Sequence, residues 1–199
     1  MKKNDRSDRA LGIRASRCVA AKTLDLDGPH ARFAQDYQPT PPEILDDLLV
    51  DLDVAFDAYT FVDLGAGKGR VLCLATQWPF SRVVGVELSR TLVAQAEENL
   101  GGYAAEIRHG DAAAFVFPAS PLVVFMYNPF DAPVVRAVLD NLERSLEEHP
   151  RDVRILYFEP VHDAVVRERW WIEPERAAPR WARYTASFGR ANGRAASSA

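Results

Sequence analysis

Hydrophobic and polar positions along the chain follow two patterns in turn. Apolar runs at residues 83–86, 122–127 and 153–158, of which the last is interrupted by Arg154, have the length of buried strands. Over residues 90–100 and 132–149, apolar side chains instead recur three and four positions apart, which is the spacing of one face of a helix. Strands that alternate with helices are typical of an α/β fold with a mostly parallel sheet. The pattern therefore predicts this fold class.

The two ends of the chain carry no sustained apolar period. Residues 1–27 are polar and charged, so we expect a flexible, at most partly helical, N-terminal extension. Residues 191–199 are small and polar, and we expect them to be disordered. One domain then spans residues 28–190, a length that suits one hydrophobic core.

Residues 28–56 begin this domain and include its first predicted helix. At residues 40–43, the Thr40 side chain can cap the first turn, the two prolines are tolerated there, and Glu43 completes a capping box. An apolar stripe follows at Ile44, Leu45, Leu48, Leu49 and Leu52. Further along the chain, Ser89 is placed in the same way to cap a helix.

The most informative motif is a glycine-rich stretch, Asp63-Leu64-Gly65-Ala66-Gly67-Lys68-Gly69, directly after the apolar residues 61–62. A strand that breaks into alternating glycines before a helical pattern is the layout of a nucleotide-binding unit. Glycine permits positive φ and the close approach of a ligand, and the N–H groups of the following helix face that ligand. A dinucleotide fingerprint has its third glycine three residues after the second, where this chain has Arg70. The stretch therefore disfavours a dehydrogenase that uses NAD.

The spacing Asp-x-Gly-x-Gly-x-Gly resembles the first motif of the class I, Rossmann-like methyltransferases that use S-adenosylmethionine. Three further signals follow in the order of that family. Glu87 ends one apolar run, Gly110-Asp111-Ala112 follows a short segment around Ile107, and Asn128-Pro129-Phe130 ends the run at 122–127. The likeness covers roughly residues 37–160. It implies a doubly wound, seven-stranded sheet that is mostly parallel and is closed by antiparallel C-terminal strands.

The resemblance also implies a role for each motif. The glycine turn passes under the amino-acid part of S-adenosylmethionine, Glu87 holds the ribose and Asp111 the adenine, and Tyr37 belongs to a lid. The implied cofactor-binding positions are Tyr37, Thr40, Asp63, Gly65, Gly67, Gly69, Glu87, Leu88, Asp111, Ala112 and Asn128, and the implied catalytic positions are Asn128, Pro129 and Phe130. Other interpretations stay open: Asp63 as a turn-stabilising residue, Tyr37 as a core residue, and Asn128-Pro129 as an ordinary strand-end turn.

The Asn-Pro-Phe sequence bears on the methyl acceptor. It is one proline shorter than the Asn-Pro-Pro-aromatic motif of enzymes that methylate adenine, cytosine or glutamine nitrogen. It is more similar to small bacterial methyltransferases and to Rossmann-like lysine methyltransferases. We therefore expect a nitrogen acceptor on a protein side chain or a small molecule. A lysine would first have to lose a proton, for which Glu159 and His162 are candidate bases. The alternatives are a non-catalytic protein that binds S-adenosylmethionine and a nucleic-acid base methyltransferase.

Composition narrows the partners. A net charge of −4 contrasts with the strongly basic face of proteins that grip duplex nucleic acid, so nucleic acid is disfavoured. The sequence has neither an apolar run of ~20 residues that could span a membrane nor a signal peptide. We therefore expect a cytoplasmic protein. The spacing of its cysteines and histidines matches no metal site, so none is expected. The acceptor and the oligomeric state are not encoded in any motif that we recognise.

Overall fold

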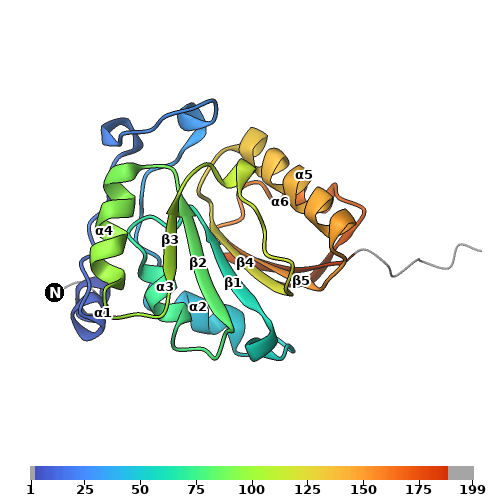
Figure 1. The fold of residues 1–199 in the computed structure, drawn as a ribbon, viewed down its shortest axis with the longest axis horizontal. Coiled ribbons are helices and arrows are strands. Elements are labelled where there is room, and N and C mark those ends of the chain that lie inside the picture. The colour runs from blue at the N-terminus through green and yellow to red at the C-terminus, as the bar shows by residue number, and fades with distance from the viewer. Residues whose placement is uncertain (1–2, 188–199) are drawn as a thin grey trace, which may run out of the picture.

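The computed structural model describes residues 3–187, and the predicted disordered tail at 191–199 lies outside them. Seven strands form one sheet in the order β3-β2-β1-β4-β5-β7-β6 (Figure 1). They are β1 (Thr60–Leu64), β2 (Arg82–Glu87), β3 (Glu106–His109), β4 (Leu122–Tyr127), β5 (Val153–Phe158), β6 (Ile172–Ala178) and β7 (Trp181–Ala186). Strands β1 to β5 pair in parallel, whereas β7 is antiparallel to both β5 and β6. The predicted α/β fold is confirmed, including the antiparallel strand near the C-terminus.

Helices cover both faces of the sheet (Figure 1). They are α1 (Lys3–Leu11), α2 (Pro42–Leu49), α3 (Arg70–Ala75), α4 (Arg90–Leu100), α5 (Ala132–Glu148) and α6 (Asp163–Arg167). Successive strand residues point to opposite faces, so Phe61 of β1 packs in the core under α2 and α3, while Val62 packs in the core under α5 and α6. All five residues of β1 are buried, as expected for the central strand of a sheet covered on both sides. None of the described helices is long and apolar enough to cross a membrane.

The helix caps agree with the sequence at one site and differ at the other. At α4, the Leu92 N–H donates to Ser89 Oγ at 3.2 Å, which confirms the predicted cap. Helix α2 instead begins at Pro42 with Pro41 as its N-cap, and no side chain caps it, so the predicted Thr40 cap is wrong. Because proline lacks an N–H, the first turn has fewer donors for a cap to satisfy.

The N-terminal residues pack on the domain beside α4 (Figure 1). The sequence predicts a flexible extension over residues 1–27, because polar residues dominate there. In the structure, α1 is followed by the buried residues Ile13 and Ala15. The Asp8 carboxylate forms a buried ion pair with Arg70 of α3 and accepts the Ala15 N–H at 2.7 Å. Polar contacts with distant residues hold this segment, and a search for apolar periodicity does not detect them.

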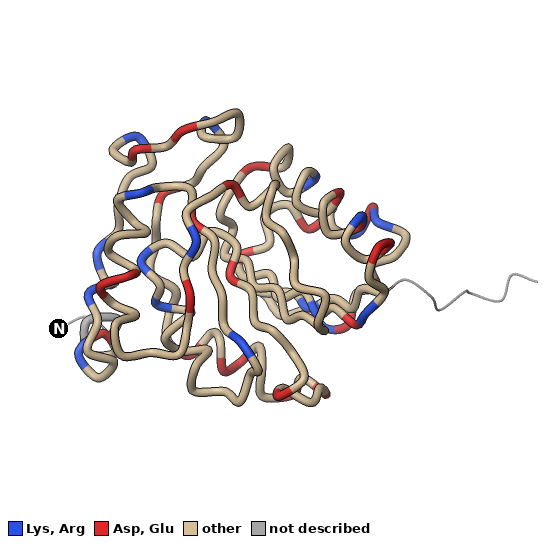
Figure 2. The backbone as a smooth tube through the Cα atoms, viewed as in Figure 1, with Lys and Arg blue, Asp and Glu red and all other residues tan. Residues whose placement is uncertain are grey.

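Charged side chains are mixed over the fold. Lys and Arg are interspersed with Asp and Glu over the sheet and the helices (Figure 2). Within the described residues, no group of three or more His, Cys, Asp and Glu side chains is placed to hold a metal ion.

Candidate functional site

The glycine turn joins β1 to α3 and packs closely against two other segments. Gly65 and Gly67 have φ values of +81° and +54°, a left-handed conformation that favours glycine. A Cβ atom on Gly65 would lie 2.5 Å from Cβ of Pro129, and one on Gly67 would lie 2.3 Å from Cε2 of Tyr37. The turn therefore has room for neither side chain, and its backbone faces the residues after β4 and the N-terminal segment.

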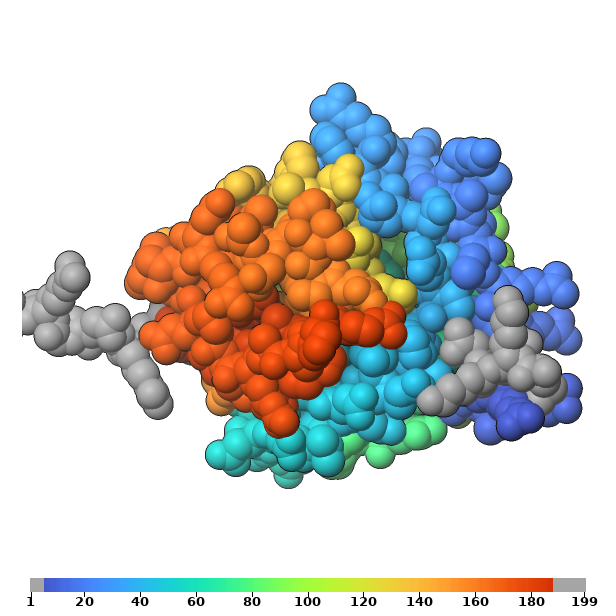
Figure 3. Space-filling model, turned by 180° about the vertical axis from the view of Figure 1, so that it is seen from behind, coloured from blue at the N-terminus to red at the C-terminus, as the bar shows by residue number. Residues whose placement is uncertain are grey.

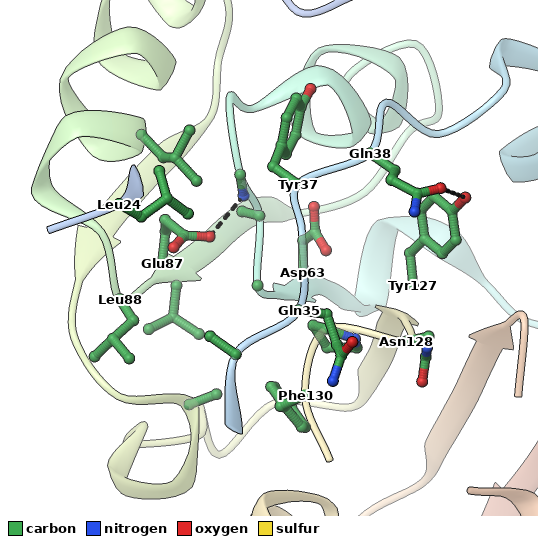
Figure 4. A pocket seen from close by; sticks show the side chains of 18 of the residues that line it. Leu24, Gln35, Tyr37, Gln38, Asp63, Glu87, Leu88, Tyr127, Asn128 and Phe130 are labelled. Carbon is green, nitrogen blue, oxygen red and sulfur yellow. Dashed lines mark hydrogen bonds between the residues drawn. The ribbon is translucent and has the colours of Figure 1, made fainter. Parts of the chain in front are cut away.

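Glu87 is held in place at the end of β2. Its side chain is buried, and Oε2 accepts the Gly67 N–H at 2.9 Å (Figure 4). Its Oε1 accepts the Ser89 N–H at 2.9 Å. Burial raises the pKa of this carboxyl, and the backbone N–H bonds counteract part of that shift. A carboxylate oxygen can accept two hydrogen bonds, so each oxygen retains a lone pair for a ligand.

Asp63, at the start of the turn, is a buried carboxylate that faces the cavity described below. Its exposed fraction is 3%, and among residues 3–187 no group donates a hydrogen bond to it. Burial, and next the negative charge of Glu87, raise the pKa of Asp63 well above its usual range. A buried carboxylate without a partner is unfavourable, so a cationic group of a ligand would stabilise it.

A cavity of about 210 Å³ lies over the glycine turn, at the carboxyl ends of the parallel strands. Figure 3 shows a hollow between the light-blue N-terminal chain and the yellow residues that follow β4. The predicted residues that line the cavity are Tyr37, Thr40, Asp63, Gly65, Gly67, Glu87, Leu88, Asp111, Ala112, Asn128, Pro129 and Phe130. Gly69 is not among the lining residues. A Cβ there would lie 3.2 Å from Cβ of Ala96, so this glycine lets α3 pack against α4.

Residues 18–40, which we call the strap, cross the mouth of the cavity and are fastened along their length. Asp25 Oδ1 accepts the Ser89 hydroxyl at 2.6 Å, which, with a backbone bond from Thr91, lowers the pKa of Asp25 to about 2. His30 Nδ1 lies 2.6 Å from Oδ2 of Asp111, the residue implied for adenine. This contact of His30 could not be predicted from the sequence, because the two residues are far apart in the chain.

Tyr37 and Thr40 end the strap. The Tyr37 ring lies against Gly67, its hydroxyl donates to the Ala15 carbonyl at 2.8 Å, and its backbone pairs with Val19. Thr40 is buried, and its carbonyl accepts a hydrogen bond from Arg70 Nη1 at 3.3 Å. Tyr37 is thus both packed and in the cavity wall, as a lid residue would be.

The tip of β4 carries the implied catalytic residues. Asn128 has a φ of +34°, which is uncommon for a residue other than glycine and often marks a functional turn. Its Oδ1 lies 3.5 Å from the Tyr157 hydroxyl. The Pro129 carbonyl accepts the Gln35 N–H of the strap at 3.2 Å. Phe130 is only 7% exposed and forms part of the cavity wall.

The two candidate bases lie away from this centre. Glu159 forms an ion pair with Arg180, and His162 Nε2 is 4.0 Å from Asp131 Oδ1. Neither belongs to the residues that line the cavity. We therefore derive no proton-transfer step through them.

Comparison with known proteins agrees with this geometry. Residues 61–149 match the model of a methyltransferase domain family. A proposed RNA methyltransferase from Pyrococcus horikoshii has 18% identity and a TM-score of 0.58, over 94% of this chain and 100% of its own. A TehB-like, S-adenosylmethionine-dependent methyltransferase from Corynebacterium glutamicum has 15% identity and a TM-score of 0.52, over 74% and 86% of the two chains. At these identities the likeness establishes the fold. No curated protein sequence matches the chain significantly.

The residues of the cavity fit S-adenosylmethionine on two observations. The Asp63 carboxylate, buried without a hydrogen-bond donor among the described residues, would face the cofactor's ammonium group. Glu87 keeps one lone pair on each oxygen, which suits the two hydroxyls of a ribose. Residues 61–149 thus match a methyltransferase domain family, and the fold and the cavity suit S-adenosylmethionine as the cofactor.

Proposed function

We propose that the protein methylates a nitrogen atom of a protein side chain or a small molecule. The observation that carries the proposal is the position of Asn128. Its carboxamide stands at the tip of β4, in a left-handed backbone conformation, and lines the same cavity as Asp63 and Glu87. A carboxamide oxygen accepts hydrogen bonds from an N–H group, so it can hold an amine with its lone pair directed along the cavity.

The bound cofactor supplies the electrophilic methyl carbon. The protein's own contribution is alignment and the exclusion of water. The lone pair of the acceptor nitrogen forms the new N–C bond while the S–C bond breaks, its electron pair remains on sulfur, and the nitrogen then releases a proton to solvent. Asn128 orients the acceptor for this in-line displacement, and the strap and Phe130 cover the reacting atoms. Alignment of this kind accounts for catalysis without a nucleophilic residue.

Two observations bear on nucleic acid as the acceptor. The mixed charges of the fold offer little of the phosphate-neutralising surface that drives nucleic-acid affinity (Figure 2). One similar structure is nevertheless named as a proposed RNA methyltransferase. RNA is therefore included among the acceptors in the test.

The test uses S-adenosylmethionine labelled in the transferred methyl group. Cell extract is separated into protein, small-molecule and RNA fractions, and the label in each is counted for the wild type, Asn128→Ala and Gln77→Ala. Gln77 is an exposed glutamine after α3, outside the cavity lining, and serves as the control. We expect label in the protein or small-molecule fraction, a loss of about 100-fold in Asn128→Ala from misalignment, and no loss in Gln77→Ala.

Each other outcome has a defined meaning. Label in RNA would contradict the proposed acceptor class. Full activity of Asn128→Ala would contradict the role of the β4 tip. Binding of S-adenosylhomocysteine with no transfer to any fraction would favour the non-catalytic alternative.

A further inference from the structure

The strap brings a second amide to the β4 tip. Ala34 forms an antiparallel bridge with Phe130, and the Gln35 N–H donates to the Pro129 carbonyl at 3.2 Å. The strap is therefore joined, at one isolated bridge, to the residues that follow Asn128. This pairing holds the Gln35 backbone next to the proposed acceptor site. The Pro129 carbonyl oxygen already accepts one hydrogen bond, from the Gln35 N–H.

The hydrogen bonds of the Gln35 side chain define which of its ends is the oxygen. Nε2 donates to Oδ1 of Asp131 at 2.7 Å. A carboxylate only accepts hydrogen bonds, so the NH₂ end must face Asp131 and the carbonyl Oε1 must be the other end. Gln35 and Asn128 both line the cavity, and in Figure 4 Gln35 lies between Phe130 and Asn128.

We propose that Gln35 supplies the second hydrogen-bond acceptor of the methyl-acceptor site, beside Asn128, and that the site selects a nitrogen carrying at least two hydrogens. This inference rests on the proposed function. Two amide oxygens can accept both N–H groups of a neutral primary amine and leave its lone pair directed at the methyl carbon. A hydroxyl has a single hydrogen, so one of the two oxygens would lose its partner, which disfavours that acceptor.

The test needs no knowledge of the natural acceptor. Sinefungin is an analogue of S-adenosylmethionine in which a carbon bearing a primary amine replaces the methylated sulfur. Its amine therefore occupies the space between the cofactor and the acceptor, where it reports on nearby oxygens. Calorimetry gives the dissociation constants of S-adenosylhomocysteine and sinefungin, and their ratio isolates the contribution of the amine. The proteins compared are the wild type, Gln35→Leu and the surface control Gln77→Leu.

We expect the wild type to bind sinefungin more tightly than S-adenosylhomocysteine. Gln35→Leu should reduce this preference about tenfold, the value of one hydrogen bond to a charged amine, and should bind S-adenosylhomocysteine as the wild type does. Gln77→Leu should leave both constants unchanged.

Two results would overturn the assignment of Gln35. One is an unchanged preference in Gln35→Leu. The other is an equal loss of affinity for both ligands in that variant, which would indicate a structural role in the strap. Failure of the proposed function would look different, because it would appear as methyl transfer to RNA, or to no fraction, in the labelling experiment with the wild type.

Discussion

The buried ion pair between Asp8 and Arg70 predicts that the N-terminal helix is needed for stability. The two side chains are 6% and 2% exposed, and Asp8 also accepts the Ala15 N–H. Removing one partner of a buried pair destabilises a protein by about 3–5 kcal/mol, because the remaining charge loses its compensation. Arg70 keeps its hydrogen bond to the Thr40 carbonyl, so we expect Asp8→Ala to lie at the lower end, about 3 kcal/mol.

For a domain of this size, each kcal/mol lowers the melting temperature by about 2–4 °C, so Asp8→Ala should melt roughly 6–12 °C below the wild type. Differential scanning calorimetry at pH 7 measures the shift. The matched control is Arg82→Ala, which breaks a pair with Glu106 whose side chains are 39% and 50% exposed. Exposed pairs contribute about 1 kcal/mol or less, so this control should shift the melting temperature by at most about 4 °C.

Equal, small shifts in the two variants would refute the reasoning, because they would show that residues 3–27 are not anchored as the structure describes. Asp8→Asn provides a further check. It can still accept the Ala15 N–H but has no charge for Arg70, so its melting temperature should fall between those of Asp8→Ala and the wild type.

Two further predictions concern the cofactor cavity. Gly67→Ala should weaken the binding of S-adenosylhomocysteine at least tenfold, as measured by calorimetry. The new Cβ would displace the Tyr37 ring, and an alanine at a φ of +54° costs about 1–2 kcal/mol. The control Gly102→Ala, which has open space around its Cβ, should bind as the wild type does. Affinity should also depend on pH. The ammonium group of the cofactor binds best when Asp63 is ionised, and burial raises the pKa of Asp63. The affinity for the cofactor is therefore full above that raised pKa and falls as the pH drops through it. Asp63→Asn should bind more weakly at pH 8 and change less with pH, and an equally steep decline in this variant would contradict the assignment.

The strands and the main motif were predictable from the sequence because their signals are local. Residues 122–127 and 153–158 coincide with β4 and β5, since a buried parallel strand is a nearly continuous apolar run, broken here only at Arg154. The glycine turn is equally local, because positive φ restricts the residue type. Strand β3 gave a weaker signal. It lies at the edge of the sheet and is mostly exposed, so only Ile107 marks it.

The family resemblance implied a lid at Tyr37, but the contacts that hold the strap could not be predicted, because they join residues that are not neighbours in the chain. The pair His30 and Asp111 and the pair Gln35 and Pro129 leave no periodic pattern in the sequence. The same holds for Asp8, a charged residue in a polar stretch that the fold buries against Arg70. Local propensity and apolar periodicity do not report such contacts, which depend on the tertiary fold.

The measurement that tests the cofactor site most directly is calorimetric titration of S-adenosylhomocysteine into the wild type and Glu87→Ala, with NAD as the control ligand. Glu87 is chosen because its two oxygens are already oriented by the Gly67 and Ser89 N–H groups. We expect micromolar binding to the wild type, a loss of at least tenfold in a Glu87→Ala variant whose melting curve shows that it is folded, and no binding of NAD. Binding of NAD, or no binding of S-adenosylhomocysteine to the folded wild type, would contradict the assignment of this cavity to S-adenosylmethionine.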